Sequence, residues 1–338
     1  MNSGRVAIIG AGSWGTALAL LVAEKGIATS LWGHRAEHIQ ALKEERENRA
    51  YLPGFLFPPV LRPTESMQDA VSEAEVICVV VPSHAYRQVI TKINDVASEG
   101  AIFVSATKGI ENQSLKTMTQ VMADCLEENG TPPSSLGVLS GPSFAREVAG
   151  KVPTAITIGC KNSAIARFLQ NLFSTDYFRV YTSTDIVGLE VSAALKNIIA
   201  IAAGICDGLA FGSNARAALI TRGLAEMTRL GVMMGARQET FFGLSGLGDL
   251  VLTCTGELSR NRYVGIELGK GKSLDDILGS MNMVAEGIKT TRSVYDLVNK
   301  LGADMPILEQ VYEVLYRGKD CTTAVKDLLN RDLKPENE

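Results

Sequence analysis

Residues 5–15 read RVAIIGAGSWG, an apolar run that leads directly into three glycines with the spacing GxGxxG. Residues 16–21, TALALL, continue as an apolar segment typical of a helix, so the glycines lie between a strand and a helix. In that setting Gly10 permits a tight turn, Gly12 lets a diphosphate approach the backbone, and Gly15 allows the helix to pack closely against the strand. The N–H groups and the positive dipole end of the helix favour an anion. The motif predicts a dinucleotide-binding unit, and a glycine turn in an unrelated α/β protein is the alternative.

From residue 5 to about residue 181, short apolar runs alternate with longer amphipathic segments, which is typical of βα units that form a mainly parallel sheet. Residues 76–81 are apolar throughout, as expected of a central strand covered by helices on both faces. We expect strands at residues 6–9, 29–32, 76–81, 101–106, 136–139, 154–158 and 178–180. Residues 53–63 are rich in proline, and we expect them to form a surface loop.

Beyond Ser183 the pattern changes, because Ala, Leu, Met and Ile recur at helical spacing. We therefore expect two domains: a Rossmann-type, mainly parallel sheet with helices on both faces at residues 1–183, which binds a dinucleotide, and an all-helical substrate and catalytic domain at 184–338. Residues 185–206 predict a long helix that is interrupted by Glu190 and Lys196, so we expect a buried helix rather than a membrane span. The glycine-containing residues 243–248 and 265–271 are expected to be loops.

Composition excludes several classes of protein. The 338 residues carry 33 Lys and Arg against 37 Asp and Glu, so the net charge of −4 gives no sign of nucleic-acid binding or of attraction to a membrane surface. The six cysteines are widely spaced without a CxxC pair, and residues 1–5 do not resemble a secretory signal, which favours reduced thiols in a cytoplasmic protein. We expect no metal, because no His, Cys or carboxylate cluster has the spacing of metal ligands.

The end of the second predicted strand bears on the choice of cofactor. Residues 31–35 read LWGHR and lack the carboxylate that binds the ribose 2′-hydroxyl in NAD-selective proteins. Arg35 has the geometry to pair with a 2′-phosphate, so we expect NADP(H) to be preferred, with NAD(H) possible because Glu37 is near. A solvated Arg35 at the start of a helix is the alternative.

Further polar residues follow the ends of other strands, where ligands of parallel sheets bind. His84 either lines the cofactor crevice or acts as a general base. Lys108 either meets an anionic substrate or is simply solvated. Residues 141–145, GPSFA, place backbone donors at the start of a helix.

Lys196 is the most informative residue of the helical half. It is the third residue of the stretch ALKNIIAI at 194–201, on a predicted helix with little polar surface. Lysine is seldom buried without a partner. Burial lowers the pKa of an amine toward the range useful for proton transfer, and a second cation such as Lys108 would act in the same direction. A lysine that reaches solvent, or one paired with Glu190 or Asp249, is the alternative.

Two more polar groups complete the candidates. Asp249 lies between a glycine-rich turn and an apolar run, where its carboxylate could orient an ammonium or bind a substrate hydroxyl. Residues 259–262, SRNR, offer hydroxyl, guanidinium and amide donors suited to a phosphate, although such a tetrapeptide is also a common polar helix start.

Together these motifs resemble one known family, that of the bacterial NAD(P)H-dependent glycerol-3-phosphate dehydrogenases, from Gly10 to about Gly318. The matching stretches are IGAGSWGTA at 9–17, VPSH at 81–84, ATKG at 106–109, SGPSFA at 140–145, KN at 196–197, NAR at 214–216, GLGDL at 246–250, SRN at 259–261 and VAEG at 284–287.

The resemblance implies reversible hydride transfer between NAD(P)H and dihydroxyacetone phosphate, giving sn-glycerol 3-phosphate for phospholipid synthesis, with Lys196 as the proton acceptor in alcohol oxidation. It implies that substrate is surrounded by Lys108, Gly141, Ser143, Lys196, Asp249, Ser259, Arg260 and Asn261. It implies that the dinucleotide is held by Gly10, Gly12, Ser13, Trp14, Gly15, His34, Arg35, Lys108, Ala145, Arg260, Val284 and Glu286. A homodimer is a further expectation from the resemblance.

Two other functions stay open at this stage. A β-hydroxyacid dehydrogenase also pairs a dinucleotide fold with a helical domain and a Lys-Asn site, and it would prefer an unphosphorylated hydroxyacid. A protein that only senses the dinucleotide would bind cofactor without turnover, but such a protein needs neither a buried amine nor a second anionic pocket.

Overall fold

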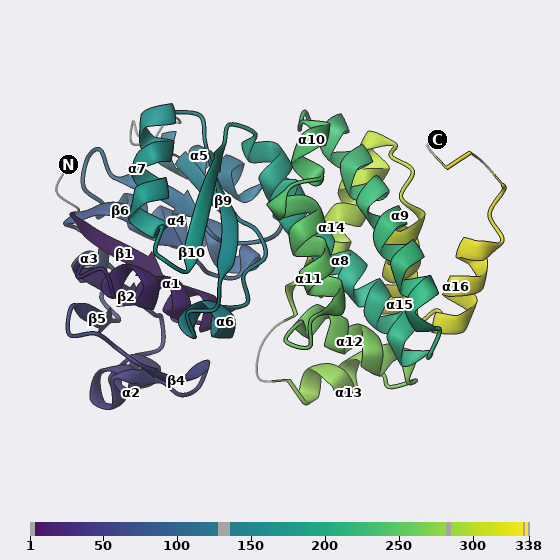
Figure 1. Cartoon of the computed structure of the whole chain (residues 1–338), viewed down its shortest axis with the longest axis horizontal. Helices are drawn as coiled ribbons and strands as arrows, with labels where there is room; N and C mark the ends of the chain where they lie inside the picture. Colours follow the sequence, from purple (N-terminus) through teal and green to yellow (C-terminus); the bar gives the residue numbers. More distant parts are fainter. Residues whose placement is uncertain (1–3, 128–135, 282–284, 334, 337–338) are drawn as a thin grey trace.

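A sheet-containing half and a helical half lie side by side in the computed structural model, which describes residues 4–127, 136–281, 285–333 and 335–336 (Figure 1). The strands are β1 Arg5–Ile9, β2 Thr29–Trp32, β3 Glu47–Asn48, β4 Leu52–Leu56, β5 Leu61–Thr64, β6 Ala74–Val79, β7 Ile102–Ser105, β8 Leu136–Ser140, β9 Thr154–Cys160 and β10 Phe178–Ser183. The helices of the first half are α1 Ser13–Ala23, α2 Ala36–Glu45, α3 Met67–Val71, the 3-10 turn η1 Ser83–Ala85, α4 Tyr86–Asn94, α5 Met118–Glu127, α6 Ala145–Ala149 and α7 Ser163–Phe173.

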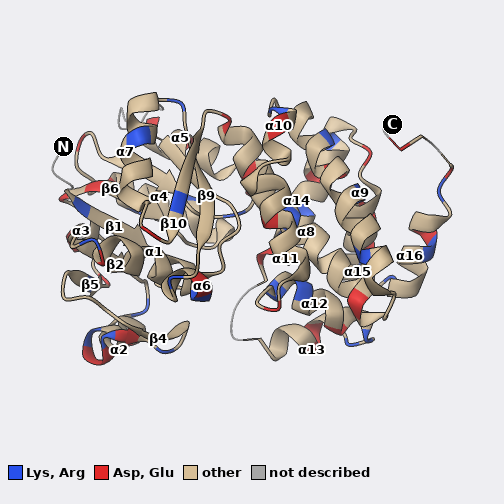
Figure 2. Cartoon of the chain, viewed as in Figure 1, with Lys and Arg blue, Asp and Glu red and all other residues tan. Residues whose placement is uncertain are grey.

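The helical half begins after β10. Its elements are α8 Ile186–Gly208, α9 Gly212–Met233, α10 Gln238–Phe241, the π-helical turn η3 Leu244–Gly248, α11 Asp249–Thr255, α12 Arg260–Gly269, α13 Leu274–Gly279, α14 Glu286–Leu301, α15 Pro306–Arg317 and α16 Cys321–Leu329. Basic and acidic residues are interspersed over both halves on the face drawn in Figure 2.

The sheet has eight strands in the order β10-β9-β8-β7-β6-β1-β2-β5, and every neighbouring pair is parallel except β8 with β9. The alternation of β1 explains why helices cover both faces: Val6 and Ile8 pack with α1, whereas Ala7 and Ile9 pack with α4. The predicted mainly parallel, doubly covered sheet is therefore confirmed. Because the chain proceeds from β1 to β2 on one side and later to β6 on the other, the order of strands reverses at the end of β1, where ligands of such sheets bind.

All seven predicted strands are present, with ends shifted by a few residues, but the expected loop at residues 53–63 is wrong. This stretch contains most of β4 and the start of β5, and β5 pairs in parallel with β2 so that Pro63 lies opposite Leu31. A proline is tolerated there because β5 is the edge strand, where a backbone N–H is not needed for a further neighbour.

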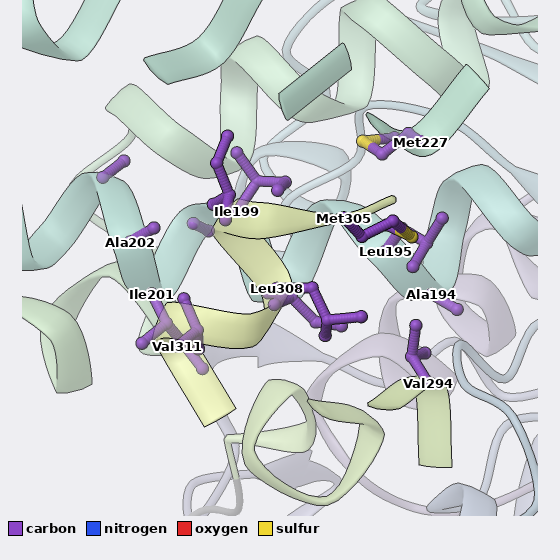
Figure 3. Packing of buried hydrophobic residues seen from close by; sticks show 14 of the residues in the cluster. Ala194, Leu195, Ile199, Ile201, Ala202, Met227, Val294, Met305, Leu308 and Val311 are labelled. Carbon is purple, nitrogen blue, oxygen red and sulfur yellow. The ribbon is translucent and has the colours of Figure 1, made fainter. Parts of the chain in front are cut away.

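Helix α8 is the core of the second half. Asp185 caps it by accepting a hydrogen bond from the Gly188 N–H at 3.0 Å. Among the described helices it is the one long and apolar enough to cross a membrane, but 94% of its most apolar window is buried within the protein. Ile199 and Leu195 pack there with Met227 of α9 and Leu308 of α15 (Figure 3). The predicted buried helix is confirmed.

A glycine seam, formed by Gly204 and Gly208 of α8 with Gly265 and Gly269 of α12, joins these two helices. A Cβ atom on Gly265 would lie 2.0 Å from the Ile201 carbonyl oxygen, so the two backbones are in direct contact. The expected loop at residues 265–271 is therefore wrong, because α12 continues to Gly269 and its glycines serve close packing. Residues 243–248 are likewise mostly the π-helical turn η3 rather than a loop.

Candidate active site

The turn after β1 contains three glycines, of which Gly10 and Gly15 have no room for a side chain, whereas Gly12 does. Gly10 has a φ of +131°, and a Cβ there would lie 2.3 Å from the Val80 carbonyl oxygen. A Cβ on Gly15 would lie 1.8 Å from the Gly10 carbonyl oxygen, so only glycine lets α1 pack on the turn. In contrast, a Cβ on Gly12 would meet no described atom within 4 Å. The open space beside Gly12, which is half-buried, leaves room for a group to approach its backbone.

The start of α1 fits an anionic group. Gly12 is its N-cap residue, and no side chain caps the helix within the described part of the protein. The indole N–H of Trp14 is buried and has no hydrogen-bond partner among the described residues. Backbone donors at the positive end of a helix, beside an open glycine, are suited to the diphosphate of a dinucleotide. The predicted residues of this turn therefore fit the cofactor.

A short segment that the sequence did not single out supports this turn. Asn48 of β3 is fully buried and donates hydrogen bonds to the Ala11 carbonyl at 3.1 Å and to the Thr16 hydroxyl at 2.7 Å. Three residues later, the Tyr51 carbonyl accepts a hydrogen bond from the Ser13 hydroxyl at 2.7 Å. No local pattern marks these residues, because their partners lie more than 30 positions away in the sequence.

Arg35 follows β2 and is the N-cap residue of α2, which is the helix-start position named as the alternative for it. Its guanidinium donates a hydrogen bond to the Tyr51 hydroxyl and lies 5.7 Å from the centre of the Tyr51 ring. The Arg35 side chain is exposed, and so are His34 and Glu37 on either side of it. The structure thus places a solvent-facing cation near the glycine turn, joined to Ser13 through Tyr51.

Three charged side chains from distant parts of the chain meet at the other part of the site. Lys196 of α8 is 4% exposed, and Asp249 at the start of α11 is 1% exposed. The Lys196 ammonium donates hydrogen bonds to one Asp249 oxygen and, at 2.9 Å, to the Thr253 hydroxyl. Lys108, from the loop after β7, donates to the other Asp249 oxygen at 3.0 Å. The Asp249 carboxylate is therefore shared by two lysines.

The electrostatics of this group favour proton transfer. Burial is the largest influence on Lys196 and lowers its pKa, and the nearby positive charge of Lys108 lowers it further. The Asp249 carboxylate opposes both effects, because it stabilises the ammonium. The pairing of Lys196 with Asp249, which the sequence offered as an alternative to a role in proton transfer, is present, and Lys108 lies close by as expected. Glu190, the other partner considered, instead accepts hydrogen bonds from the Thr119 backbone at 2.7 Å and the Thr119 hydroxyl at 2.5 Å.

The number of donors on Lys196 matters for its chemistry. A lysine ammonium has three N–H groups, and its contacts with Asp249 and Thr253 use two of them. Neither contact uses the third N–H. Thr253 was missed in the sequence, although it follows Asp249 by four residues on α11 and so lies on the same face of that helix.

Residues 259–261 start α12 beside this group. Ser259 is the N-cap residue and accepts a hydrogen bond from the Arg262 N–H at 3.2 Å, which is the helix-start role considered for this stretch. Asn261 donates to the Asn197 side chain at 2.9 Å and accepts from the Gly287 N–H at 3.0 Å. Since Asn197 follows Lys196 directly, Asn261 fixes α12 and the start of α14 against the lysine.

Glu286 and Arg260 lie near the same charges. Glu286 is the first residue of α14, and burial raises its pKa to about 7, against the opposing effect of the cations Arg260, Lys108 and Lys196. The Ser83 backbone N–H also stabilises the Glu286 carboxylate. The side chain of Arg260 is exposed at the start of α12. The cations from both halves therefore converge around Glu286.

The loop at residues 141–144 joins the two halves. The Ser143 hydroxyl donates to the Gly141 carbonyl at 3.0 Å. A Cβ on Gly141 would lie 2.9 Å from Ile156 Cα, so this glycine packs against β9, and Ala145 begins α6. Phe144 reaches Gly256, where an added Cβ would come within 2.5 Å of its ring. The loop thus lies next to the segment between α11 and α12.

Some predicted residues are not joined to this group. His84 is exposed on η1, so neither its lining role nor its role as a base is tested. His34 is exposed at the Arg35 end of the site. Val284 lies outside the described residues. Among the residues that the structure describes, no three His, Cys, Asp or Glu side chains are grouped as metal ligands would be.

The chain is similar to proteins of one known family over nearly its whole length. The family model described as NAD-dependent glycerol-3-phosphate dehydrogenase N-terminus matches residues 5–166, and that of the C-terminus matches residues 185–326. The chain is 58% identical over 335 residues to glycerol-3-phosphate dehydrogenase [NAD(P)+] of Desulfotalea psychrophila, covering 98% of each chain. It is 52% identical to the protein of that name from Citrifermentans bemidjiense, again covering 98% of each. The crystal structure of glycerol-3-phosphate dehydrogenase from Coxiella burnetii is 41% identical, with a TM-score of 0.93 over 97% of this chain and 99% of that one.

Proposed function

Because the chain belongs to the NAD-dependent glycerol-3-phosphate dehydrogenase family, we propose that Lys196 is the acid–base group with which it interconverts dihydroxyacetone phosphate and sn-glycerol 3-phosphate. The enzyme is an oxidoreductase that uses NAD(P)H. The observation that carries the assignment of Lys196 is its burial in contact with Asp249 and Thr253. That environment lowers the pKa of the amine while leaving it one N–H for the substrate.

In the direction of reduction, Lys196 acts as an ammonium. Its remaining N–H points a proton at the ketone oxygen, stabilises the negative charge that develops there, and then transfers the proton. NAD(P)H, when bound, supplies the hydride. Asp249 holds the ammonium in place, and Lys108, which contacts the other oxygen of the same carboxylate, adds a positive charge nearby. In alcohol oxidation the neutral amine of Lys196 accepts the proton instead.

The phosphate of the substrate is the second anchor. We propose that Arg260, Asn261 and Ser259 bind it at the start of α12, with the loop carrying Gly141 and Ser143 and with Lys108 completing the pocket. Three donor types at one helix start support this role, because guanidinium, amide and backbone N–H groups all bind phosphate oxygens. Binding energy from the phosphate can then hold the reacting carbon in position for the chemical step.

For the dinucleotide, we propose that Gly10, Gly12, Ser13, Trp14 and Gly15 bind the diphosphate at the start of α1. Arg35 would pair with a 2′-phosphate, so NADP(H) is the preferred form, with His34 beside it. The open Gly12 and the solvent-facing guanidinium near it support this assignment. Ala145, Lys108, Arg260, Val284 and Glu286 would contact the remaining part of the cofactor.

We propose that the enzyme is cytoplasmic. The cysteines that the structure describes are buried and none forms a disulfide, which favours the cytoplasm. Supply of glycerol phosphate to phospholipid synthesis follows from the activity. We propose residues 1–183 and 184–338 as the two domains because the last strand ends at Ser183. We also propose that the enzyme is a homodimer without nucleic-acid or membrane partners. Light scattering, which measures the mass of the particle, checks the dimer.

One coupled assay tests the proposal. Dihydroxyacetone phosphate is reduced with NADPH or with NADH, and the oxidation of each cofactor is followed by its absorbance. We expect turnover with both and a higher kcat/KM with NADPH. Faster turnover of an unphosphorylated hydroxyacid would favour a β-hydroxyacid dehydrogenase, and cofactor binding without any turnover would favour a sensor.

A further inference from the structure

Asn48 is a buried residue whose side-chain amide links the glycine turn after β1 to the segment that carries Tyr51. It lies on β3, a two-residue strand outside the main sheet, and is fully buried. Its amide nitrogen donates to the Ala11 carbonyl at 3.1 Å and to the Thr16 hydroxyl at 2.7 Å. These two residues flank the open Gly12, so Asn48 fixes both ends of the glycine turn.

The oxygen of the same amide contacts Tyr51 and His38, near Arg35. It accepts a hydrogen bond from the Tyr51 N–H at 3.2 Å and lies 3.2 Å from Nε2 of His38 on α2. Tyr51 in turn binds the Arg35 guanidinium through its hydroxyl and its ring face. The Tyr51 carbonyl also accepts from Ser13 at 2.7 Å, which closes a ring of contacts back to the turn.

The need for asparagine follows from this geometry. A side-chain amide has two N–H donors and a carbonyl acceptor in one plane, and Asn48 uses both donors and the acceptor. An aspartate of the same shape cannot donate, and it would direct negative charge at the Ala11 carbonyl. A buried group that loses its partner costs more than a hydrogen bond at the surface does, because no water replaces the partner.

We propose that Asn48 is a positioning residue for the dinucleotide, which it serves without contacting it. Through Ala11 and Thr16 it sets the glycine turn, and through Tyr51 it sets Arg35, so one side chain fixes the distance between the diphosphate site and the 2′-phosphate site. The inference rests on the proposed function, since it assumes that Arg35 meets a 2′-phosphate. It makes Asn48 and Tyr51 determinants of NADP(H) affinity and of the preference for NADP(H) over NAD(H).

The test measures cofactor binding in the absence of substrate. The full-length protein is titrated with NADPH and with NADH, and binding is detected by fluorescence. For Asn48→Asp we expect the Kd for NADPH to rise about ten- to hundredfold, with a smaller rise for NADH. In steady-state assays the loss should appear in the KM for NADPH rather than in kcat or in the KM for dihydroxyacetone phosphate. The melting temperature of each variant is measured in parallel.

Asn162→Ala is the matched control. Asn162 is exposed and caps α7 by accepting from the Ala164 and Ile165 N–H groups, so this variant also loses two hydrogen bonds of an asparagine side chain. It should lower the melting temperature without changing either Kd. An Asn48→Asp protein that is folded and binds NADPH as the wild type does would overturn the proposal. So would a fall in kcat with unchanged KM for the cofactor.

Tyr51→Phe keeps the test decisive if Asn48→Asp does not fold. This variant retains the ring beneath Arg35 and removes only the hydroxyl acceptor. We expect weaker binding of NADPH and unchanged binding of NADH, and equal affinities for NADPH in variant and wild type would contradict the inference. Because binding is measured without substrate, a wild-type protein that binds NADPH but reduces no dihydroxyacetone phosphate would refute the proposed function and leave the role of Asn48 standing.

Discussion

Replacing Asp249 by asparagine tests the central electrostatic claim. The substitution keeps the shape of the side chain but removes the charge shared by Lys196 and Lys108. Two unit charges about 4 Å apart attract by about 4 kcal/mol at an effective dielectric constant of about 20, which corresponds to about 3 pKa units. Part of this is offset by the amide dipole and by water, so we expect the pKa of Lys196 to fall by about one to three units.

The direction of the effect on activity can be worked out for both reactions. Reduction needs the Lys196 ammonium, so in Asp249→Asn the rate of dihydroxyacetone phosphate reduction should decline at a lower pH than in the wild type. Oxidation needs the neutral amine, so the rate of glycerol phosphate oxidation should rise at a lower pH. Both midpoints are read from kcat/KM measured across a range of pH.

Glu190→Gln provides the matched control for this measurement. It also neutralises a buried carboxylate on α8, but Glu190 makes its contacts with Thr119 rather than with Lys196. Its pH profile should retain the wild-type midpoints. If Asp249→Asn also retains them, or moves them to higher pH, then Asp249 does not stabilise the Lys196 ammonium and the reasoning fails.

Three further substitutions test other parts of the structure. Lys196→Ala should bind NADPH nearly as the wild type does but lose about 10² to 10⁴-fold in turnover, since it lacks the acid–base group, and near-normal rates of cofactor oxidation would remove Lys196 from the mechanism. Arg35→Asp should shift the ratio of kcat/KM values from NADPH toward NADH, because a carboxylate repels a 2′-phosphate, and an unchanged ratio would count against that contact. Gly265→Ala should lower the free energy of unfolding by about 1 to 3 kcal/mol, because its Cβ would lie 2.0 Å from the Ile201 carbonyl oxygen. Its control in denaturant titrations is Gly279→Ala, where an added Cβ meets no described atom within 4 Å and where we expect little loss.

Much of the fold could be predicted because the strong signals are local. The glycine turn, the apolar strand at the centre of the sheet and the long apolar helix each carry their pattern within a few residues, and all three are confirmed. Three expected loops are wrong, and two of them, at residues 53–63 and 265–271, have one cause. Pro63 in β5 and Gly265 in α12 normally disfavour a strand or a helix, but an edge position and a tightly packed neighbour make them acceptable. Such tolerance depends on tertiary contacts that no short stretch of sequence reveals.

The residues of the site also fall into two groups, those that a local sequence signal identifies and those that only tertiary contacts reveal. Lys196 was identifiable because a lysine in an apolar helix is unusual, and the position of Thr253 four residues after Asp249 gave a usable signal that was not applied. Asn48 gave no signal at all, since its partners Ala11 and Thr16 lie on another element and an asparagine in a polar stretch is common. Residues that act by holding others are visible only when the contacts themselves are known.

The glycine seam between α8 and α12 rigidly joins two groups that we propose to bind different ends of the substrate. Lys196 and Asn197 lie on one of these helices, Ser259, Arg260 and Asn261 at the head of the other, and backbone touches backbone where the helices cross. If Lys196 donates the proton and residues 259–261 bind the phosphate, the packed helices set the spacing between these two groups in the absence of ligand. A substrate longer or shorter by one carbon would then not fit both groups at once.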